Sequence, residues 1–133
     1  MIYAVIDTNV LVSIMMSKSS YSTVSKILNA IVDGRITPMY NDEMVAEYRE
    51  VLSRKKFDFI PEACEALVYY LVNHGLDSER VPFEEIMPDE SDRVFYEIAL
   101  SKDGAFLVTG NLKHFPTTPI VVTPAEMLHI LEG

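Results

Sequence analysis

Hydrophobic residues along the chain gather in short unbroken runs that alternate with longer segments of helical periodicity. Five short runs predict buried strands at Ile2–Ile6, Ile36–Tyr40, Arg80–Phe83, Ala105–Val108 and Ile120–Val122. The longer segments predict helices at Tyr21–Val32, Asp42–Leu52, Pro61–Asn73, Asp92–Ser101 and Pro124–Leu131. Near-continuous apolar strands that alternate with helices are typical of a parallel sheet covered on both faces. The pattern therefore predicts an α/β fold.

Residues with special backbone preferences indicate where these elements end. Thr123 before Pro124 is a typical start for the last helix. Gly34 and Gly75 follow predicted helix ends, where a left-handed residue is favoured. The segment 53–60 predicts a loop between two helices.

The first strand runs directly into Asp7, Thr8 and Asn9, and a further apolar helix follows. A buried strand thus carries a carboxylate to its C-terminal end, with the Thr8 hydroxyl and the Asn9 amide beside it. In open α/β sheets, this end of the strands is where ligands usually bind. Asp7 alone could equally cap the helix that follows.

More carboxylates and an amide stand at comparable positions. Glu47 belongs to a row of acids on one helical face and lies nearest to its apolar border. Asp89 and Asp92 lie at the start of a predicted helix, where they could also be ordinary capping residues. Asn111 follows the end of the fourth predicted strand.

Several converging carboxylates would raise one another's pKa, and a divalent cation removes that cost. Oxygen ligands suit Mg²⁺ or Mn²⁺, and the chain has no His/Cys cluster with zinc spacing. Such an ion can activate water and neutralise a phosphate oxygen in a displacement reaction. The acids therefore favour metal-assisted phosphoryl chemistry.

Composition narrows the class of protein. With 133 residues, of which 49% are hydrophobic, the chain is long enough for one domain with its own core, spanning residues 1–133. No apolar run reaches the ~18 residues that span a bilayer, and no signal-peptide pattern is present, so we expect no membrane partner. The single Cys64 cannot form an internal disulfide, which fits a cytoplasmic location.

The net charge of −9 is unusual for a nucleic-acid binder, which ordinarily shows a basic surface. Either the substrate is not a nucleic acid, or the negative charge is concentrated in a metal site and the basic residues act locally. The run Arg54-Lys55-Lys56 is ordinarily a solvated loop, but it could also contact phosphates.

Four segments resemble the PIN domain family in order and spacing, and together they cover nearly the whole chain: Val5–Ser13, Glu43–Leu52, Pro88–Leu100 and Phe106–Asn111. They are most similar to the branch that contains toxins of toxin–antitoxin pairs. The resemblance implies a three-layer α/β/α fold with a central, mainly parallel five-stranded sheet. It also implies a ribonuclease that depends on Mg²⁺ or Mn²⁺.

The resemblance assigns roles to individual residues. Asp7 matches the acid at the end of strand one, Glu47 the acid in the helix after strand two, and Asp92 the third acid; these three would hold the metal and carry catalysis. Asp89 matches an accessory acid. Asn111 stands where the family has a fourth acid. Its amide oxygen could still bind metal but adds no negative charge, which leaves one metal or two as an open question.

The remaining candidates are polar or basic neighbours of these positions. Asn9, like Thr8 and Thr109, would orient ligands or water molecules. Arg93 and the pair Lys113-His114 would lie at the mouth of the site, where they could meet the substrate.

Three functions compete on this pattern. The first is a Mg²⁺/Mn²⁺-dependent endoribonuclease of single-stranded RNA, the toxin of a toxin–antitoxin pair. The second is a catalytically weak or inactive binding module, which the Asn111 departure and the acidic charge suggest. The third is a phosphatase with Asp7 as nucleophile, but such enzymes commonly need a second Asp two residues on, where this chain has Asn9.

The resemblance also implies an RNA substrate, a protein antitoxin and a homodimer. The sequence does not identify the RNA target or the antitoxin.

Overall fold

A computed structural model describes all 133 residues and contains one five-stranded sheet in the order β3-β2-β1-β4-β5. Its strands are β1 (Ile2–Ile6), β2 (Ile36–Tyr40), β3 (Leu76–Asp77), β4 (Phe106–Val108) and β5 (Val121–Val122). Every neighbouring pair is parallel. The parallel α/β architecture predicted from the sequence is therefore confirmed.

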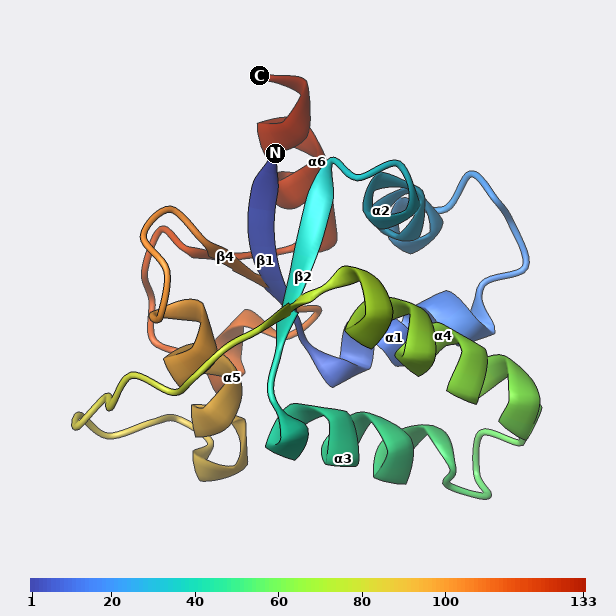
Figure 1. Ribbon diagram of the computed structural model, residues 1–133, viewed down its shortest axis with the longest axis horizontal. Helices are drawn as coiled ribbons and strands as arrows, with labels where there is room; N and C mark the ends of the chain where they lie inside the picture. Colours follow the sequence, from blue (N-terminus) through green and yellow to red (C-terminus); the bar gives the residue numbers. More distant parts are fainter.

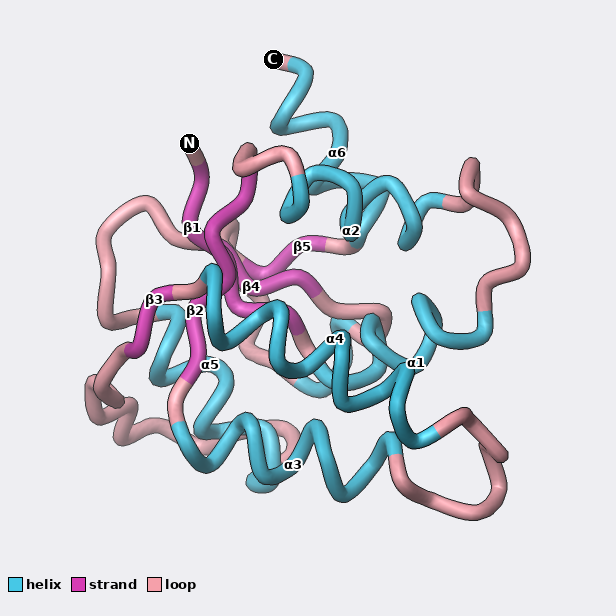
Figure 2. The backbone as a smooth tube through the Cα atoms, turned by 45° about the vertical axis from the view of Figure 1, so that its right-hand side comes forward, coloured by secondary structure: helices cyan, strands magenta, loops and turns pink.

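Six α-helices surround the sheet: α1 (Thr8–Met16), α2 (Thr23–Val32), α3 (Asp42–Leu52), α4 (Pro61–His74), α5 (Arg93–Ala99) and α6 (Pro124–Glu132). Helix α5 lies on one side of β1 and β2, and helices α2 and α4 lie on the other, which makes three layers (Figure 1). Helix α3 lies below the C-terminal ends of these strands (Figure 1). Figure 2 shows the strands among these helices, with β3 at the outer edge of the sheet.

The helix predictions are confirmed to within a few residues. The largest differences are two residues, at the start of α2 and at the end of α5, and a single 3₁₀ turn, η1 (Glu90–Asp92), precedes α5. The capping interaction at Thr123 is present. Its side chain accepts from the Glu126 N–H, and the Glu126 carboxylate accepts from the Thr123 N–H. None of the helices combines the length and the hydropathy that a bilayer crossing demands.

The core lies against the central strand β1. Ala4, Val5 and Ile6 are completely buried, and so is Leu107 of the neighbouring β4. Burial of one large aliphatic side chain contributes about 1.5–3 kcal/mol. The apolar core thus fixes the end of β1, and with it the residue that follows, Asp7.

The strand predicted at Arg80–Phe83 is wrong. These residues form an irregular segment, and the third strand is the two-residue β3, whose residues are both exposed at the edge of the sheet. Pro82 has no N–H to donate to a ladder. The Phe83 N–H donates instead to the Glu97 carboxylate, at 2.8 Å.

The two glycines differ in their role. Gly34 has a φ of +78°, the left-handed conformation expected after a helix. Gly75 has a φ of −101°, so the same expectation is wrong there. A Cβ on Gly75 would lie 2.4 Å from the Leu71 carbonyl and 2.6 Å from the Pro38 carbonyl, so Gly75 is required by close backbone packing.

One buried carboxylate anchors the irregular segment 78–88 to α5. Glu97 accepts from Arg80 Nε at 2.7 Å as well as from the Phe83 N–H, and Arg80 also binds the exposed Glu43 at 2.9 Å. Burial alone would raise the pKa of Glu97, but these hydrogen bonds and the Arg80 charge hold it below its usual value. The segment leads directly to Asp89.

We expect Glu97→Gln to lower the free energy of unfolding at pH 7 by about 2 kcal/mol, because a buried hydrogen-bonded charge pair is broken. Since the pKa of Glu97 is lowered by folding, this contribution is present above the unfolded pKa and is lost as the pH falls through the folded one. Urea denaturation at pH 7 and pH 4 measures it. The matched control is Glu43→Gln, which removes an exposed partner of the same arginine and should change stability by less than about 0.5 kcal/mol. Equal losses in both variants would show that Glu97 is not the anchor.

Candidate metal centre

Asp7 ends β1 and begins α1 with one side chain. Its Oδ1 accepts from the Thr8 N–H at 2.8 Å, which caps α1, and its Oδ2 accepts from the Thr109 hydroxyl at 2.8 Å. The backbone N–H of Asp7 donates to the Val108 carbonyl at 2.9 Å. Asp7 is only 4% exposed. The helix-capping role and a role at the end of the sheet are therefore both met by this residue.

Helix α3 brings Glu47 to the same place. The buried Tyr48 donates its hydroxyl to the Ile6 carbonyl and packs edge-on against Phe95, which fixes α3 at the end of β1. The preceding residue, Glu47, then accepts from the Thr8 hydroxyl at 2.9 Å. An anchored aromatic residue thus holds the neighbouring carboxylate over the edge of the sheet.

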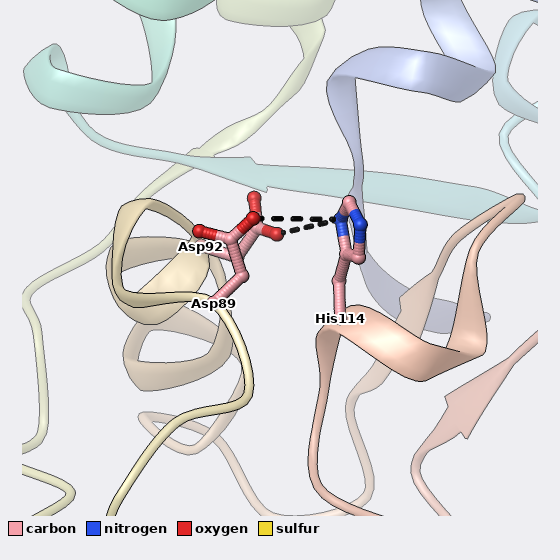
Figure 3. Close-up of side chains that lie close together, drawn as sticks. All are labelled: Asp89, Asp92 and His114. Atoms are coloured by element: carbon pink, nitrogen blue, oxygen red, sulfur yellow. Dashed lines mark ion pairs between the residues drawn. The ribbon is translucent and has the colours of Figure 1, made fainter.

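A second group of side chains comes from η1 and from the turn η2 (Leu112–His114) (Figure 3). His114 Nδ1 lies 3.1 Å from Asp92 Oδ2 and 3.9 Å from Asp89 Oδ2. One donor atom from each of the three residues lies within 4.8 Å of the others. This cluster has the ligand types and the spacing of a cation site.

Asp92 has no capping role in this arrangement. It stands at the N-terminus of α5 but its side chain accepts no capping hydrogen bond, whereas Asp89 caps η1 through Ser91. Asp92 is 8% exposed, and its buried Oδ2 has no hydrogen-bond partner. Buried carboxylate oxygens are ordinarily paired, so this atom needs a further partner.

The two groups face one cavity of about 330 Å³. Its polar lining includes the carboxylates of Asp7, Glu47, Asp89 and Asp92, with His114 and Arg54 beside them. Four carboxylates thus lie close together at the carboxyl ends of the strands.

The pKa values of Asp7 and Asp92 show that their ionised forms are unfavourable in this cavity. Burial raises the pKa of Asp7 to about 6, against the opposing hydrogen bonds from Thr109 and Thr8, and the Glu47 charge adds to the rise. Burial also raises the pKa of Asp92, and the charges of Asp7 and Asp89 raise it further. A bound cation would reverse both effects.

The accessory polar residues lie at or beneath the cavity. Thr8 and Asn9 line it. The Asn9 side chain joins the end of β1 to the end of the neighbouring β4. Its Oδ1 accepts from the Gly110 N–H at 3.0 Å and its Nδ2 donates to the Thr109 hydroxyl at 3.4 Å. Thr109 is completely buried and supports Asp7 from below.

Asn111 does not line the cavity. Its side-chain nitrogen lies 2.8 Å from His114 Nε2, and its N–H donates to the Thr109 hydroxyl at 3.0 Å. The amide therefore contacts the histidine on the side opposite to the carboxylates. The structure brings six of the ten residues selected from the sequence to the cavity, and Asn111 and Thr109 support them.

Arg93 and Lys113 lie away from it. Arg93 binds the Glu90 carboxylate and the carbonyls of Phe83 and Glu85, so that it secures the segment before η1. Lys113 is exposed and forms no ion pair. The structure does not bring either side chain to the cavity mouth expected from the sequence.

His114 is a candidate metal ligand that the sequence pattern did not indicate. It was expected at the mouth with Lys113, not among the metal-binding candidates. No sequence periodicity marks it, and only the single turn η2 carries it to Asp92. The one available signal is its position three residues after Asn111.

Fold and cavity together define a class of α/β proteins that gather carboxylates at the carboxyl edge of a parallel sheet. The sequence model of the PIN domain family matches residues 3–113. The chain therefore belongs to the PIN domain family. No curated protein and no solved structure matches it significantly. PIN domains are generally metal-dependent nucleases, and the cluster of Asp89, Asp92 and His114 could bind a divalent ion.

Proposed function

We propose that this PIN domain is a Mg²⁺- or Mn²⁺-dependent endoribonuclease that hydrolyses phosphodiester bonds of single-stranded RNA. The supporting observation is the buried Asp92 Oδ2, which has no hydrogen-bond partner and shares an acidic cavity with Asp7 and Glu47. Without a cation, only the His114 nitrogen at 3.1 Å is near this oxygen, and no hydrogen bond replaces its lost solvation.

The residues present fit a divalent ion of this kind. Asp7, Glu47 and Asp92 would hold it, with Asp89 and His114 within reach of the same position. A bound ion would lower the pKa of a water molecule and neutralise charge on a phosphate oxygen. Because a histidine nitrogen joins the oxygen donors, Mn²⁺ should bind more tightly than Mg²⁺.

The protein's own groups would orient these ligands. Thr109 and Thr8 donate to Asp7 and Glu47, which fixes both carboxylates before any ion binds. Asn111, first considered as a ligand, would instead hold the His114 imidazole in place. Arg54 supplies the only guanidinium of the cavity and could meet the substrate phosphate.

The test is cleavage of a mixed single-stranded RNA pool by the purified protein with EDTA, Mg²⁺ or Mn²⁺. We expect no cleavage with EDTA, cleavage with either ion, and the higher rate at limiting Mn²⁺. Matched double-stranded RNA serves as the control and should remain intact. Cleavage that persists in EDTA would contradict the proposal.

A catalytically inactive binding module remains the second candidate, since an amide replaces the fourth acid and contacts only His114 and Thr109. Calorimetry that detects no binding of Mn²⁺, together with no cleavage, would favour it. The phosphatase alternative is weaker, because both carboxylate oxygens of Asp7 already accept hydrogen bonds and Asn9 stands at the position of the second acid. A covalent phosphate trapped on Asp7 would support it.

The proposal includes a role as the toxin of a toxin–antitoxin pair, a homodimeric state and a cytoplasmic location. The toxin role and the homodimer rest on the similarity of the four motifs to that branch of the family, and the location rests on the single Cys64. The net charge of −9 and the acidic cavity would complement a basic inhibitory segment of an antitoxin.

A further inference from the structure

The loop between α3 and α4, residues 53–60, separates the acidic cavity from a larger hollow of about 610 Å³. Arg54 lines both hollows. Phe57 lines the acidic cavity and Phe59 lines the larger one. Their rings are stacked, with centroids 5.2 Å apart and planes within 6° of parallel. The loop thus places an aromatic pair and a guanidinium at the border of the two hollows.

Core packing does not account for Phe57. Phe59 packs against the hydrophobic core, but Phe57 does not, although it is half-buried. Asp58 between them has a φ of +53°, a left-handed conformation that costs a non-glycine residue about 1 kcal/mol. The chain thus adopts a strained backbone to hold the two rings against each other.

The charge of the loop is opposite to that of the cavity it borders. Arg54, Lys55 and Lys56 are the only three consecutive basic residues of a chain that carries a net charge of −9. Glu50 binds Arg54 through Nε and Nη2, which leaves Nη1 without a partner. Lys55 forms no ion pair, and the Lys56 ammonium lies 5.1 Å from the centre of the Phe57 ring.

We propose that this loop is the binding platform for the RNA strand next to the cleaved bond, with one base stacked on Phe57 and the adjoining phosphates on Arg54, Lys55 and Lys56. This inference rests on the proposed function, which places the scissile phosphate in the acidic cavity. A base that stacks on Phe57 replaces the Lys56 ammonium there and frees it for a phosphate. Basic groups interleaved with aromatic rings are the features that bind single strands without sequence preference.

A protein partner could also cover this half-buried aromatic pair. The consecutive basic residues favour the nucleic acid, because a polyanion is complementary to them and would contact the acidic cavity only where a cation neutralises it. We therefore assign the platform to single-stranded RNA.

The chain contains no tryptophan, so Phe57→Trp introduces a single fluorophore at the platform. We expect an unlabelled oligouridylate of ~10 nucleotides, a length within the usual site sizes, to quench the fluorescence of this tryptophan. The titration is done in EDTA at low salt. EDTA prevents cleavage and removes the metal centre from the measurement. Oligouridylate that binds by a separate assay but leaves the tryptophan emission unchanged would overturn the proposal.

Fluorescence anisotropy of the same oligonucleotide carrying a dye measures the contribution of each group. We expect Phe57→Ala to weaken binding by about 5- to 100-fold, and Phe57→Leu, which keeps an apolar side chain but loses the flat ring, to weaken it similarly. The double variant Lys55→Ala/Lys56→Ala should reduce the salt dependence by about 1.4 in the slope of log K against log salt. The control Lys26→Ala, an exposed lysine on α2, should bind normally.

These results separate the platform from the nuclease. Weakened binding in the Phe57 and lysine variants supports the platform even if no metal ion activates cleavage, in which case the proposed function alone fails. Normal binding by Phe57→Leu and by the lysine variant, in proteins whose thermal unfolding is unchanged, would overturn the platform, whatever the cleavage assay shows.

Discussion

Replacing Asp7 by asparagine is expected to lower the rate of metal-dependent RNA cleavage by about 10³-fold or more. Asp7 is the carboxylate that β1 and Thr109 hold most firmly at the edge of the sheet. Its loss removes one negative donor from the candidate metal centre, which weakens both the binding of the ion and its orientation. Single-turnover cleavage at saturating Mn²⁺ measures the rate, and calorimetry measures the affinity for Mn²⁺.

The matched control is Asp103→Asn, which neutralises an exposed carboxylate just before β4. Asp103 precedes the N-terminal end of its strand, whereas Asp7 follows the C-terminal end of β1. It should cleave at the wild-type rate. Because Asp7 also caps α1, circular dichroism must show that Asp7→Asn retains its helix content. A folded Asp7→Asn protein with wild-type, metal-dependent cleavage would contradict the assignment of Asp7.

Asp92→Asn is expected to raise the free energy of unfolding of the metal-free protein by about 2 kcal/mol at pH 8, or roughly 5–10 °C in melting temperature. Burial and the neighbouring charges of Asp7 and Asp89 raise the pKa of Asp92. The folded state therefore holds its proton to a higher pH than the unfolded state does. A neutral amide does not carry the cost of the ionised carboxylate.

The direction of these pKa shifts determines how the stability of the protein depends on pH. A carboxyl whose pKa is raised by folding stabilises the protein below the unfolded pKa, and this stability is lost as the pH rises through the folded pKa. For Asp7 the window runs from about 4 to about 6. As the pH rises through this window and beyond it, the melting temperature of the metal-free wild type should therefore fall. The fall should be smaller in Asp92→Asn. Saturating Mn²⁺ should stabilise the wild type but not the variant. A metal-free Asp92→Asn protein that is less stable at pH 8 would contradict this account.

Most of the fold was predictable because its helices follow a helical period, whereas β1, β2, β4 and β5 lie within short unbroken apolar runs. The exception shows the limit of the pattern. The apolar residues of 80–83 were interpreted as a strand, but Pro82 and the buried Glu97 make the segment irregular. The true β3 has two exposed residues and pairs with β2 at the edge, so no hydrophobic run marks it.

The candidate site was predictable where residues lie at strand ends. Asp7 could be placed from the end of its strand, while Glu47 and Asp92 depended on the motif pattern, and all three line one cavity. Arg93 was misplaced because two of its partners, the carbonyls of Phe83 and Glu85, become neighbours only when the segment before η1 folds back. His114 was predicted only at the mouth of the site and Phe57 was not selected, because a single turn and a loop bring them to the cavity and leave no periodicity in the sequence.

The bond from Thr109 to Asp7 joins residues 102 positions apart, across the parallel pair β1 and β4. Parallel pairings of this separation require the chain to close a long loop and are intrinsically slow to form. During synthesis, β1 emerges before β4, so Asp7 lacks its bond from Thr109 until β4 has left the ribosome. A growing chain therefore cannot complete its acidic cavity before residues 89–114, which supply Asp89, Asp92 and His114, have also emerged.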